Sequence, residues 1–213
     1  TVGFIKDYKV FKEGKIKKVV VAGCLTQRYK DELVEGLPEA DLFVGSGEFQ
    51  NISKILKNHD TGVKTKTFFN LPTYLQEETT PRVNSQPKHR AYLKISEGCL
   101  KRCAFCAIPL IRGNLQSRTM TNVINEAKLL VAGGVKELII ISHDFTDYGW
   151  DLRRKDSSAK ESPVELLREL SKLDGVEWVR LLYLYPDGIT PEMIELIKNN
   201  KKLVFNLHIS YLL

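Results

Sequence analysis

Residues 97–113 read EGCLKRCAFCAIPLIRG, which places Cys99, Cys103 and Cys106 at the spacing C-x-x-x-C-x-x-C. Zinc and ordinary iron–sulfur clusters take four protein ligands, so a set of three cysteines leaves one ligand position unfilled. Three thiolates can hold three irons of a cubane cluster and leave the remaining iron open to bind a small molecule. This stretch therefore predicts a catalytic cluster rather than a cluster that only transfers electrons.

The composition fits two modest domains in a reducing compartment. The chain has 213 residues, and domains commonly have roughly 100–150. Tight spacing of three of the four cysteines suits metal binding in the cytosol better than disulfide bonds. The sequence contains neither a signal peptide nor an apolar run near the ~18–20 residues of a membrane span, so we expect a cytoplasmic protein without membrane contact. The net charge of +6 fits either an anionic partner, such as the ribosome or other nucleic acid, or a lysine-rich solvated surface.

The first part of the chain, residues 1–58, alternates short strand and helix patterns. Residues 18–22 form a β-branched run that ends at Gly23-Cys24, so the thiol is expected at the carboxyl end of a strand, where open α/β sheets bind ligands. A lone Cys24 would more often be a buried structural thiol. Residues 59–90 are rich in Thr, Lys, Pro, Asn and Gln without a sustained apolar period, which predicts a linker.

The rest of the chain, residues 91–213, predicts a parallel sheet. Strand patterns alternate with helix patterns, and such βα units form right-handed crossovers. Ser162 and Thr190, each followed by Pro, are expected to cap two of the helices. Ligand-binding residues are expected at the carboxyl ends of the strands. The candidates there are the cysteine loop, Ser142-His143-Asp144 and Tyr185-Pro186-Asp187.

Two motifs resemble the radical S-adenosylmethionine (SAM) methylthiotransferase family. One is CAFCAIPLIRG at residues 103–113, followed by Ser117-Arg118, and the other is VAGCLTQRY at residues 21–29. The resemblance implies an α/β fold: a partial (βα) barrel over residues 91–213, preceded by part of a smaller α/β domain over residues 1–58. It fades after Val204, so 91–213 is expected to be the first half of a truncated radical SAM domain. We expect this chain alone to turn over weakly or not at all.

The resemblance also implies the site residues. Cys99, Cys103 and Cys106 would bind the SAM-activating [4Fe–4S] cluster. Cys24 would bind a second [4Fe–4S] cluster, for which the family has two further cysteines upstream that this chain lacks. No catalytic residue is assigned. The residues expected to contact SAM are Phe105, Ser142, Asp144 and Arg180. For Arg180 a structural ion pair is an equal alternative, for Phe105 a loop hydrophobe, and His143 is expected to be a loop residue.

In this family a reduced cluster breaks a carbon–sulfur bond of SAM and releases a 5′-deoxyadenosyl radical. The second cluster supports sulfur insertion, and another SAM supplies the methyl group. IPLIRG and LTQRY resemble the branch that modifies the β-carbon of an aspartate in the twelfth protein of the small ribosomal subunit. The implied partners are that ribosomal protein or the ribosome, and a reducing electron donor.

Three alternatives remain open. The first is a tRNA-adenosine methylthiotransferase of the same family. The second is a zinc-binding nucleic-acid module in which His89 or His143 completes the three thiolates, although the α/β pattern around the cysteines argues against it. The third is an inactive truncated remnant that keeps the fold pattern without the activity.

Overall fold

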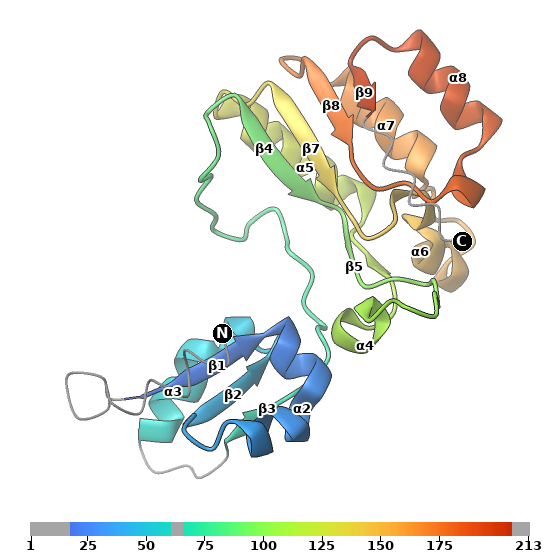
Figure 1. Ribbon diagram of the computed structural model, residues 1–213. Helices are drawn as coiled ribbons and strands as arrows, with labels where there is room; N and C mark the ends of the chain where they lie inside the picture. The colour runs from blue at the N-terminus through green and yellow to red at the C-terminus, as the bar shows by residue number, and fades with distance from the viewer. Residues whose placement is uncertain (1–17, 61–65, 206–213) are drawn as a thin grey trace. The chain divides into compact units, whose positions relative to one another are not determined.

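The computed structural model describes residues 18–60 and 66–205, and it divides them into two compact units (Figure 1). The first unit contains the described parts of Thr1–Tyr74 together with Lys101–Gly113. The second contains Leu75–Leu100 and the described part of Asn114–Leu213. The cysteine loop is therefore shared, since Cys99 belongs to the second unit and Cys103 and Cys106 belong to the first. The domain limits expected from the sequence, at 58 and 91, stay a prediction.

The first unit is built on a three-stranded parallel sheet with β2 (Leu42–Gly45) between β1 (Val20–Gly23) and β3 (Thr67–Phe68). All four residues of β2 are buried, because helices cover both faces of the sheet. On one face α2 (Cys24–Gly36) packs its Leu33 and Val34 over Phe43. On the other face Ile55 of α3 (Ile52–Asp60) packs on Leu42 and Val44, and a 3₁₀ turn, η2 (Phe49–Asn51), leads into this helix.

Two features of the first unit differ from the elements expected from the sequence. Helix α2 begins directly at Cys24, because Gly23 has a φ of 119°, a left-handed conformation that turns strand into helix without a loop. The segment expected to be a linker contributes β3, and Phe43 N donates to Lys66 O at 2.7 Å beside it. A two-residue strand is too short to leave a periodic signal in the sequence.

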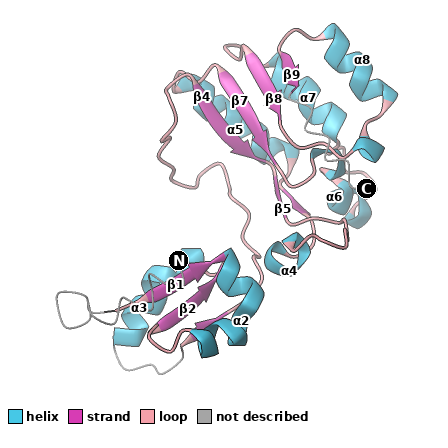
Figure 2. Ribbon diagram, in the orientation of Figure 1, coloured by secondary structure: helices cyan, strands magenta, loops and turns pink. Residues whose placement is uncertain are grey.

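The second unit confirms the expected parallel sheet. Its strands lie in the order β4 (Arg90–Lys94), β7 (Glu137–Ile141), β8 (Trp178–Leu181) and β9 (Leu203–Phe205), each parallel to its neighbour. One core joins this sheet to the helices α5 (Met120–Ala132), α7 (Pro163–Lys172) and α8 (Pro191–Asn199), shown in cyan in Figure 2. Ser162 Oγ accepts from Glu165 N at 3.2 Å, and Thr190 Oγ1 accepts from Met193 N at 3.2 Å, which confirms both expected helix caps.

Shorter elements lie at the carboxyl ends of the strands in this unit. After β4, β5 (Ser96–Glu97) pairs antiparallel with β6 (Gln116–Ser117). The chain after β7 forms η3 (Phe145–Asp147) and α6 (Trp150–Lys155), and the chain after β8 forms η4 (Pro186–Gly188). In the first unit, α4 (Ile108–Arg112) follows the last cysteine of the loop.

The segment after residue 74 is fixed to the second unit rather than loose. Gln76 Nε2 and Arg82 Nη1 donate to Glu126 Oε1 of α5, at 2.9 and 2.5 Å. Arg82 Nη1 also donates to Tyr92 O, and Asn84 Nδ2 donates to Arg90 O, both at 3.0 Å. These side chains therefore bind the edge strand β4 and helix α5.

None of the helices in the described ranges is long and apolar enough to cross a membrane.

Candidate metal and cofactor site

The cysteine loop supplies three free thiols of different exposure. Cys99 is separated from β5 by Gly98 and is buried, whereas Cys103 and Cys106 are half-buried. Cys106 N donates to Cys103 O at 3.0 Å, so these two cysteines lie in one tight turn. Lys101 and Arg102 lie in the same loop, where their positive charge suits an anionic cluster. Soft thiolate ligands of this kind are the ones that iron–sulfur clusters take.

The donor chemistry of the loop fits a cluster. Across residues 18–60 and 66–205, no three Cys, His, Asp or Glu side chains converge on one point as a metal-binding group. Cys99 is carried by one unit and the other two cysteines by the other. The assignment of Cys99, Cys103 and Cys106 as cluster ligands therefore stays a prediction, supported by residue type and spacing.

Glu97 is a site residue that sequence reasoning missed. Its side chain is only 4% exposed and forms an ion pair with Lys94, and its Oε1 lies 3.6 Å from His143 Nε2. Gly98 N also donates to Glu97 Oε1 at 3.3 Å. The carboxylate thus joins the start of the cysteine loop to β4, and it lies close to His143 in the chain after β7. The available signal was its position two residues before Cys99, next to the glycine.

Ser142 and Asp144 lie at the carboxyl end of β7, as expected, and both are buried. Asp144 Oδ1 accepts from Thr146 N at 2.9 Å, from Thr146 Oγ1 at 2.7 Å and from Tyr185 N at 3.3 Å. Phe145 N also donates to Tyr183 O at 3.0 Å. The structure therefore brings together two of the predicted groups, the chain after β7 and the chain after β8, through the Asp144 carboxylate.

Arg180 and Phe105 are the other two residues that the sequence predicts to contact SAM. Arg180 pairs in register with Ile139, and its guanidinium forms an ion pair with Glu137, at the amino end of β7. This contact corresponds to the structural ion pair that the sequence left as an alternative. Phe105 is 64% exposed in the cysteine loop. A direct role of either side chain in SAM binding stays a prediction.

Ser117 and Arg118 follow the cysteine loop, and their hydrogen bonds are with residues of the second unit. Arg118 is buried, and its Nη1 donates to Lys94 O and to Glu126 Oε2, both at 2.6 Å. Tyr148 Oη donates to Arg118 O at 2.9 Å, and Gly149 N donates to Ser117 Oγ at 2.9 Å. Burial, together with the negative charge of Glu161, raises the pKa of Tyr148 well above its ordinary value of 10.0. The tyrosine therefore stays a neutral donor in this network.

Cys24 lies in the first unit with a positive charge against its sulfur. It is exposed at the first position of α2, and Arg112 Nη2 of α4 lies 3.3 Å from Cys24 Sγ. Ser46 Oγ donates to Ile111 O at 3.1 Å beside this contact. A thiol at a helix N-terminus with a guanidinium next to it suits an anionic iron–sulfur ligand. Its role in a second cluster stays a prediction.

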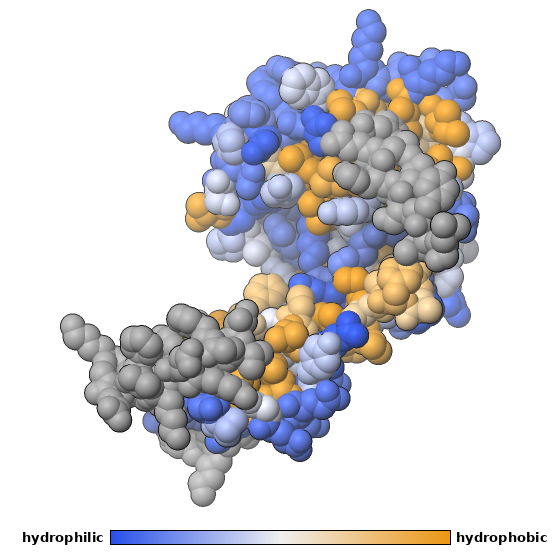
Figure 3. Space-filling view, in the orientation of Figure 1, coloured by the Kyte–Doolittle hydropathy of each residue, from blue (hydrophilic) through white to orange (hydrophobic). Residues whose placement is uncertain are grey.

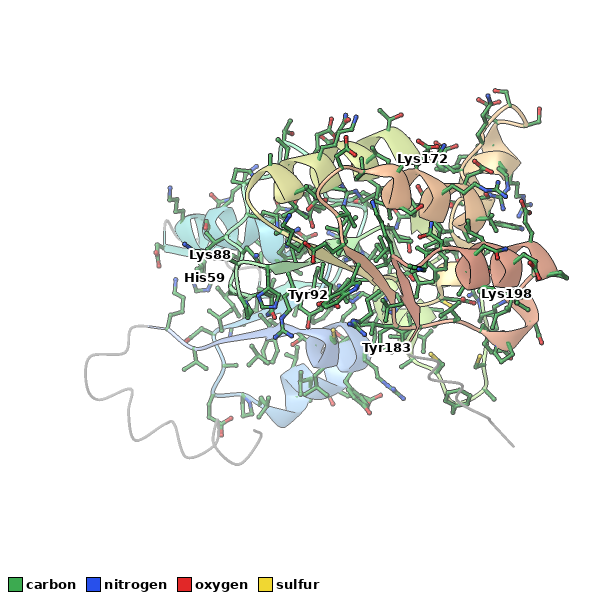
Figure 4. All side chains as sticks on the ribbon, turned by 90° about the horizontal axis from the view of Figure 1, so that it is seen from above. His59, Lys88, Tyr92, Lys172, Tyr183 and Lys198 are labelled. Atoms are coloured by element: carbon green, nitrogen blue, oxygen red, sulfur yellow. The ribbon has the colours of Figure 1, made fainter. Side chains whose placement is uncertain are left out.

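The face of the second sheet opposite its helices carries polar and aromatic side chains. Tyr92 and Trp178 are 42% and 48% exposed on β4 and β8. Tyr183, just after β8, is 52% exposed, and Figure 4 labels it together with Tyr92. Figure 3 shows hydrophilic and apolar surface side by side over the second unit.

Two hollows of about 480 and 260 Å³, by α6 and by the start of α7, contain none of the predicted site residues.

Comparisons with known proteins show the superfamily of this chain. The profile described as the radical SAM superfamily matches residues 93–211. The ribosomal protein uS12 methylthiotransferase RimO of Bdellovibrio bacteriovorus is 74% identical over 96% of this chain and 47% of that protein. RimO of Thermoanaerobacter sp. is 42% identical over 96% of this chain and 48% of that protein, and RimO of Trichlorobacter lovleyi is 44% identical over 90% and 41%. The chain thus spans about half the length of the curated relatives it matches.

Solved structures support the fold. The radical SAM methyltransferase TsrM of Kitasatospora setae, with tryptophan and a SAM analogue bound, aligns with a TM-score of 0.56 at 14% identity, over 95% of this chain and 42% of that one. TsrM with cobalamin and a [4Fe–4S] cluster bound aligns with a TM-score of 0.54 at 15% identity, over 95% and 43%. At this identity the likeness concerns the fold, and it confirms the expected α/β class.

Proposed function

Because this chain belongs to the radical SAM superfamily, we propose that it acts in a methylthiotransferase that modifies ribosomal protein uS12. The observation that carries the proposal is the similarity to RimO proteins, which extends over nearly the entire chain and so includes both units. The proposed acceptor atom is the β-carbon of one aspartate.

The cofactors of the superfamily are a [4Fe–4S] cluster and SAM, which together supply reductive cleavage of a carbon–sulfur bond and a carbon-centred radical. Cys99, Cys103 and Cys106 are the proposed thiolate ligands of that cluster. Lys101 and Arg102 add positive charge beside them, which favours an anionic group. Glu97 and Arg118 hold the two ends of the loop in the second unit, so the chain's own contribution is orientation.

The chain after β7 is the proposed SAM-binding edge. Ser142 and Asp144 lie there, and Asp144 orders the backbone of two neighbouring loops by its three hydrogen bonds. A cofactor bound at this edge would meet fixed backbone groups, which lowers the entropy lost on binding. Phe105 is proposed to shield the cluster from water, and the contact with Glu137 supports a structural role for Arg180.

The proposed partners are uS12 or the ribosome that contains it, and a reducing electron donor. The net charge of +6 favours approach to the anionic ribosome. Cys24 is proposed to be one ligand of a second [4Fe–4S] cluster that supports sulfur insertion. Its position next to Arg112 supports this assignment.

The cluster assignment is tested by anaerobic reconstitution with iron and sulfide. We expect iron–sulfur absorption that disappears when Cys99, Cys103 and Cys106 are all replaced by Ala. Cys24→Ala is the matched control, because a single thiol outside the loop cannot hold a cluster by itself and its loss should leave this absorption in place. Absorption that persists in the triple variant, or one equivalent of zinc without iron, would contradict the assignment.

The substrate is tested by mass spectrometry of uS12 from cells with and without the gene that encodes this chain, because the chain alone is expected to turn over weakly or not at all. We expect one methylthio group on an aspartate-containing peptide of uS12 that is absent from the knockout. Total tRNA from the same cells is the control. Loss of a methylthio group from adenosine in tRNA, with uS12 unchanged, would favour the tRNA-modifying branch and overturn the proposal.

A further inference from the structure

We infer that Ser46 and Arg112 are positioning residues, and that through them the first unit holds the part of the cysteine loop that carries Cys103 and Cys106. This inference rests on the proposed cluster function and adds the residues that fix two of its three thiols. Its starting point is an unusual division of the chain. Residues 101–113 belong to the first unit, although the residues on either side of them belong to the second.

Helix α4 needs support from outside itself. It has only five residues, and isolated helices shorter than about 12–15 residues are marginal in water. Its own backbone bonds run from Ile111 N to Ala107 O at 3.1 Å and from Gly113 N to Pro109 O at 3.0 Å. Ile111 is buried, and α4 packs against α2. The first unit therefore provides the surface on which this short helix is stable.

Ser46 fixes the end of α4 with a buried hydrogen bond. Its side chain follows β2 and is only 5% exposed, and its Oγ donates to Ile111 O at 3.1 Å. Ile111 O is one of the last carbonyls of the helix, which have no partner within the helix. A buried carbonyl without a donor costs more than an ordinary hydrogen bond gains. Loss of the Ser46 hydroxyl should therefore loosen this end of α4.

Arg112 fixes the same end of α4 by a second, independent contact. Its Nη2 lies 3.3 Å from Cys24 Sγ, at the first residue of α2. The last residue of one helix thus binds the first residue of the other. Gly113 follows with a φ of 76°, a conformation that favours glycine. A Cβ atom added at this position would lie 3.7 Å from Leu71 Cδ1. The chain turns away at this point, so the contact ends with Arg112.

The position of α4 determines the position of two thiols. Cys106 is separated from α4 by Ala107 alone, and its amide donates to Cys103 O. A shift of α4 must therefore move both Cys106 and Cys103. Cys99 is held separately, by β5 and the buried Glu97 in the second unit. Release of α4 should change the first two thiols and leave the third unchanged.

The test measures thiol alkylation in the full-length protein without its cluster, under anaerobic reducing conditions, with each cysteine followed by mass spectrometry. We expect Ser46→Ala to increase the alkylation rates of Cys103 and Cys106 about tenfold, as for the loss of one buried hydrogen bond. Arg112→Gln removes an exposed contact and should increase the same two rates by a smaller factor. The rate for Cys99 should not change. Ser53→Ala and Arg28→Gln are matched controls, since both residues are exposed on helices of the same unit.

Hydrogen exchange of residues 107–113 provides a second readout that needs neither iron nor activity. We expect faster exchange of the Ile111 and Gly113 amides in both variants. The two controls should keep the native exchange rates. Native alkylation and exchange rates in both variants would overturn the inference, as would an equal increase at Cys99, which would indicate general destabilisation. Failure of uS12 modification would overturn the proposed function and leave these rates interpretable.

Discussion

Among single residues, Arg118 and Glu126 form a buried ion pair in the second unit. Both side chains are at most 4% exposed, and their ion pair is 2.6 Å long. Glu126 also accepts from Gln76 and Arg82, so one carboxylate serves three donors. A buried charge of this kind is tolerated only because it is paired and hydrogen-bonded.

Replacement of Glu126 by Gln should lower the free energy of unfolding by about 3–5 kcal/mol, because the buried Arg118 guanidinium loses its countercharge. Urea unfolding followed by circular dichroism measures the change. Glu195→Gln is the control, since Glu195 faces Lys198 at 3.8 Å on an exposed surface and should change stability by less than about 0.5 kcal/mol. Equal effects of the two substitutions would contradict the role given to burial.

The phenol of Tyr148 should make stability fall at alkaline pH. Its pKa is raised in the folded state from the ordinary 10.0, so above about pH 10 the unfolded chain releases a proton that the folded chain keeps. Below that pH the contribution of this group to the free energy of unfolding is fully present and does not change with pH, and it decreases as the pH rises further. At neutral pH, Tyr148→Phe should lower the free energy of unfolding by about 1 kcal/mol, because the hydrogen bond to Arg118 O is lost. The same substitution should reduce the decrease in stability at alkaline pH.

Urea midpoints of both proteins, measured from about pH 8 upward, test this expectation. Tyr183→Phe, at a half-exposed tyrosine outside the Arg118 network, is the control for removal of a hydroxyl. An identical alkaline decrease in the wild-type protein and Tyr148→Phe would exclude Tyr148 as its source.

At the scale of elements, the caps of α7 and α8 show how local sequence determines helix starts. Ser162→Ala should destabilise the second unit by about 1 kcal/mol, because Glu165 N loses its acceptor at the first turn of α7. Thermal unfolding followed by circular dichroism measures this loss. Ser157→Ala, at an exposed loop serine nearby, should leave the midpoint unchanged. A loss of the same size in both variants would argue against a capping role for Ser162.

The elements that the sequence predicts well are those with local signals. Strand β7 appears as a β-branched run and β4 as an alternating pattern, and the starts of α7 and α8 appear as Ser-Pro and Thr-Pro. Strand β3 and the ordered segment after Tyr74 depend on partners distant in sequence, such as Phe43 and Glu126. No local pattern can indicate such contacts.

The candidate site divides in the same way. Three cysteines within eight residues are visible in the sequence, because their chemistry depends on residue type and spacing. The contacts of Ser46 with Ile111 and of Cys24 with Arg112 join positions 65 and 88 residues apart. Such contacts exist only once the chain has folded. Glu97 combines a local and a distant signal. Its position beside the cysteine loop can be read from the sequence, whereas its burial depends on the fold.

On the scale of the whole molecule, each unit has a hydrophobic core of its own. Leu167 is fully buried in the core of the second unit, and Phe43 is 1% exposed in the first. Proteins with several domains often unfold in more than one step. We therefore expect calorimetry to resolve two transitions.

Core substitutions assign each transition to a unit. Leu167→Ala should cost about 2–5 kcal/mol and lower one transition, whereas Phe43→Ala should cost about 3–5 kcal/mol and lower the other. Each variant is the control for the other. A single transition that both substitutions lower equally would show that the two units unfold as one.

Strand β4 forms one margin of the second sheet, where backbone groups could pair with a strand from another molecule. Arg82 and Asn84 already donate to the carbonyls of Tyr92 and Arg90 on that margin. Side chains from the preceding segment thus occupy acceptors that intermolecular stacking would use. The consequence concerns solubility: because the chain shields its own margin, aggregation by strand pairing at β4 should be disfavoured.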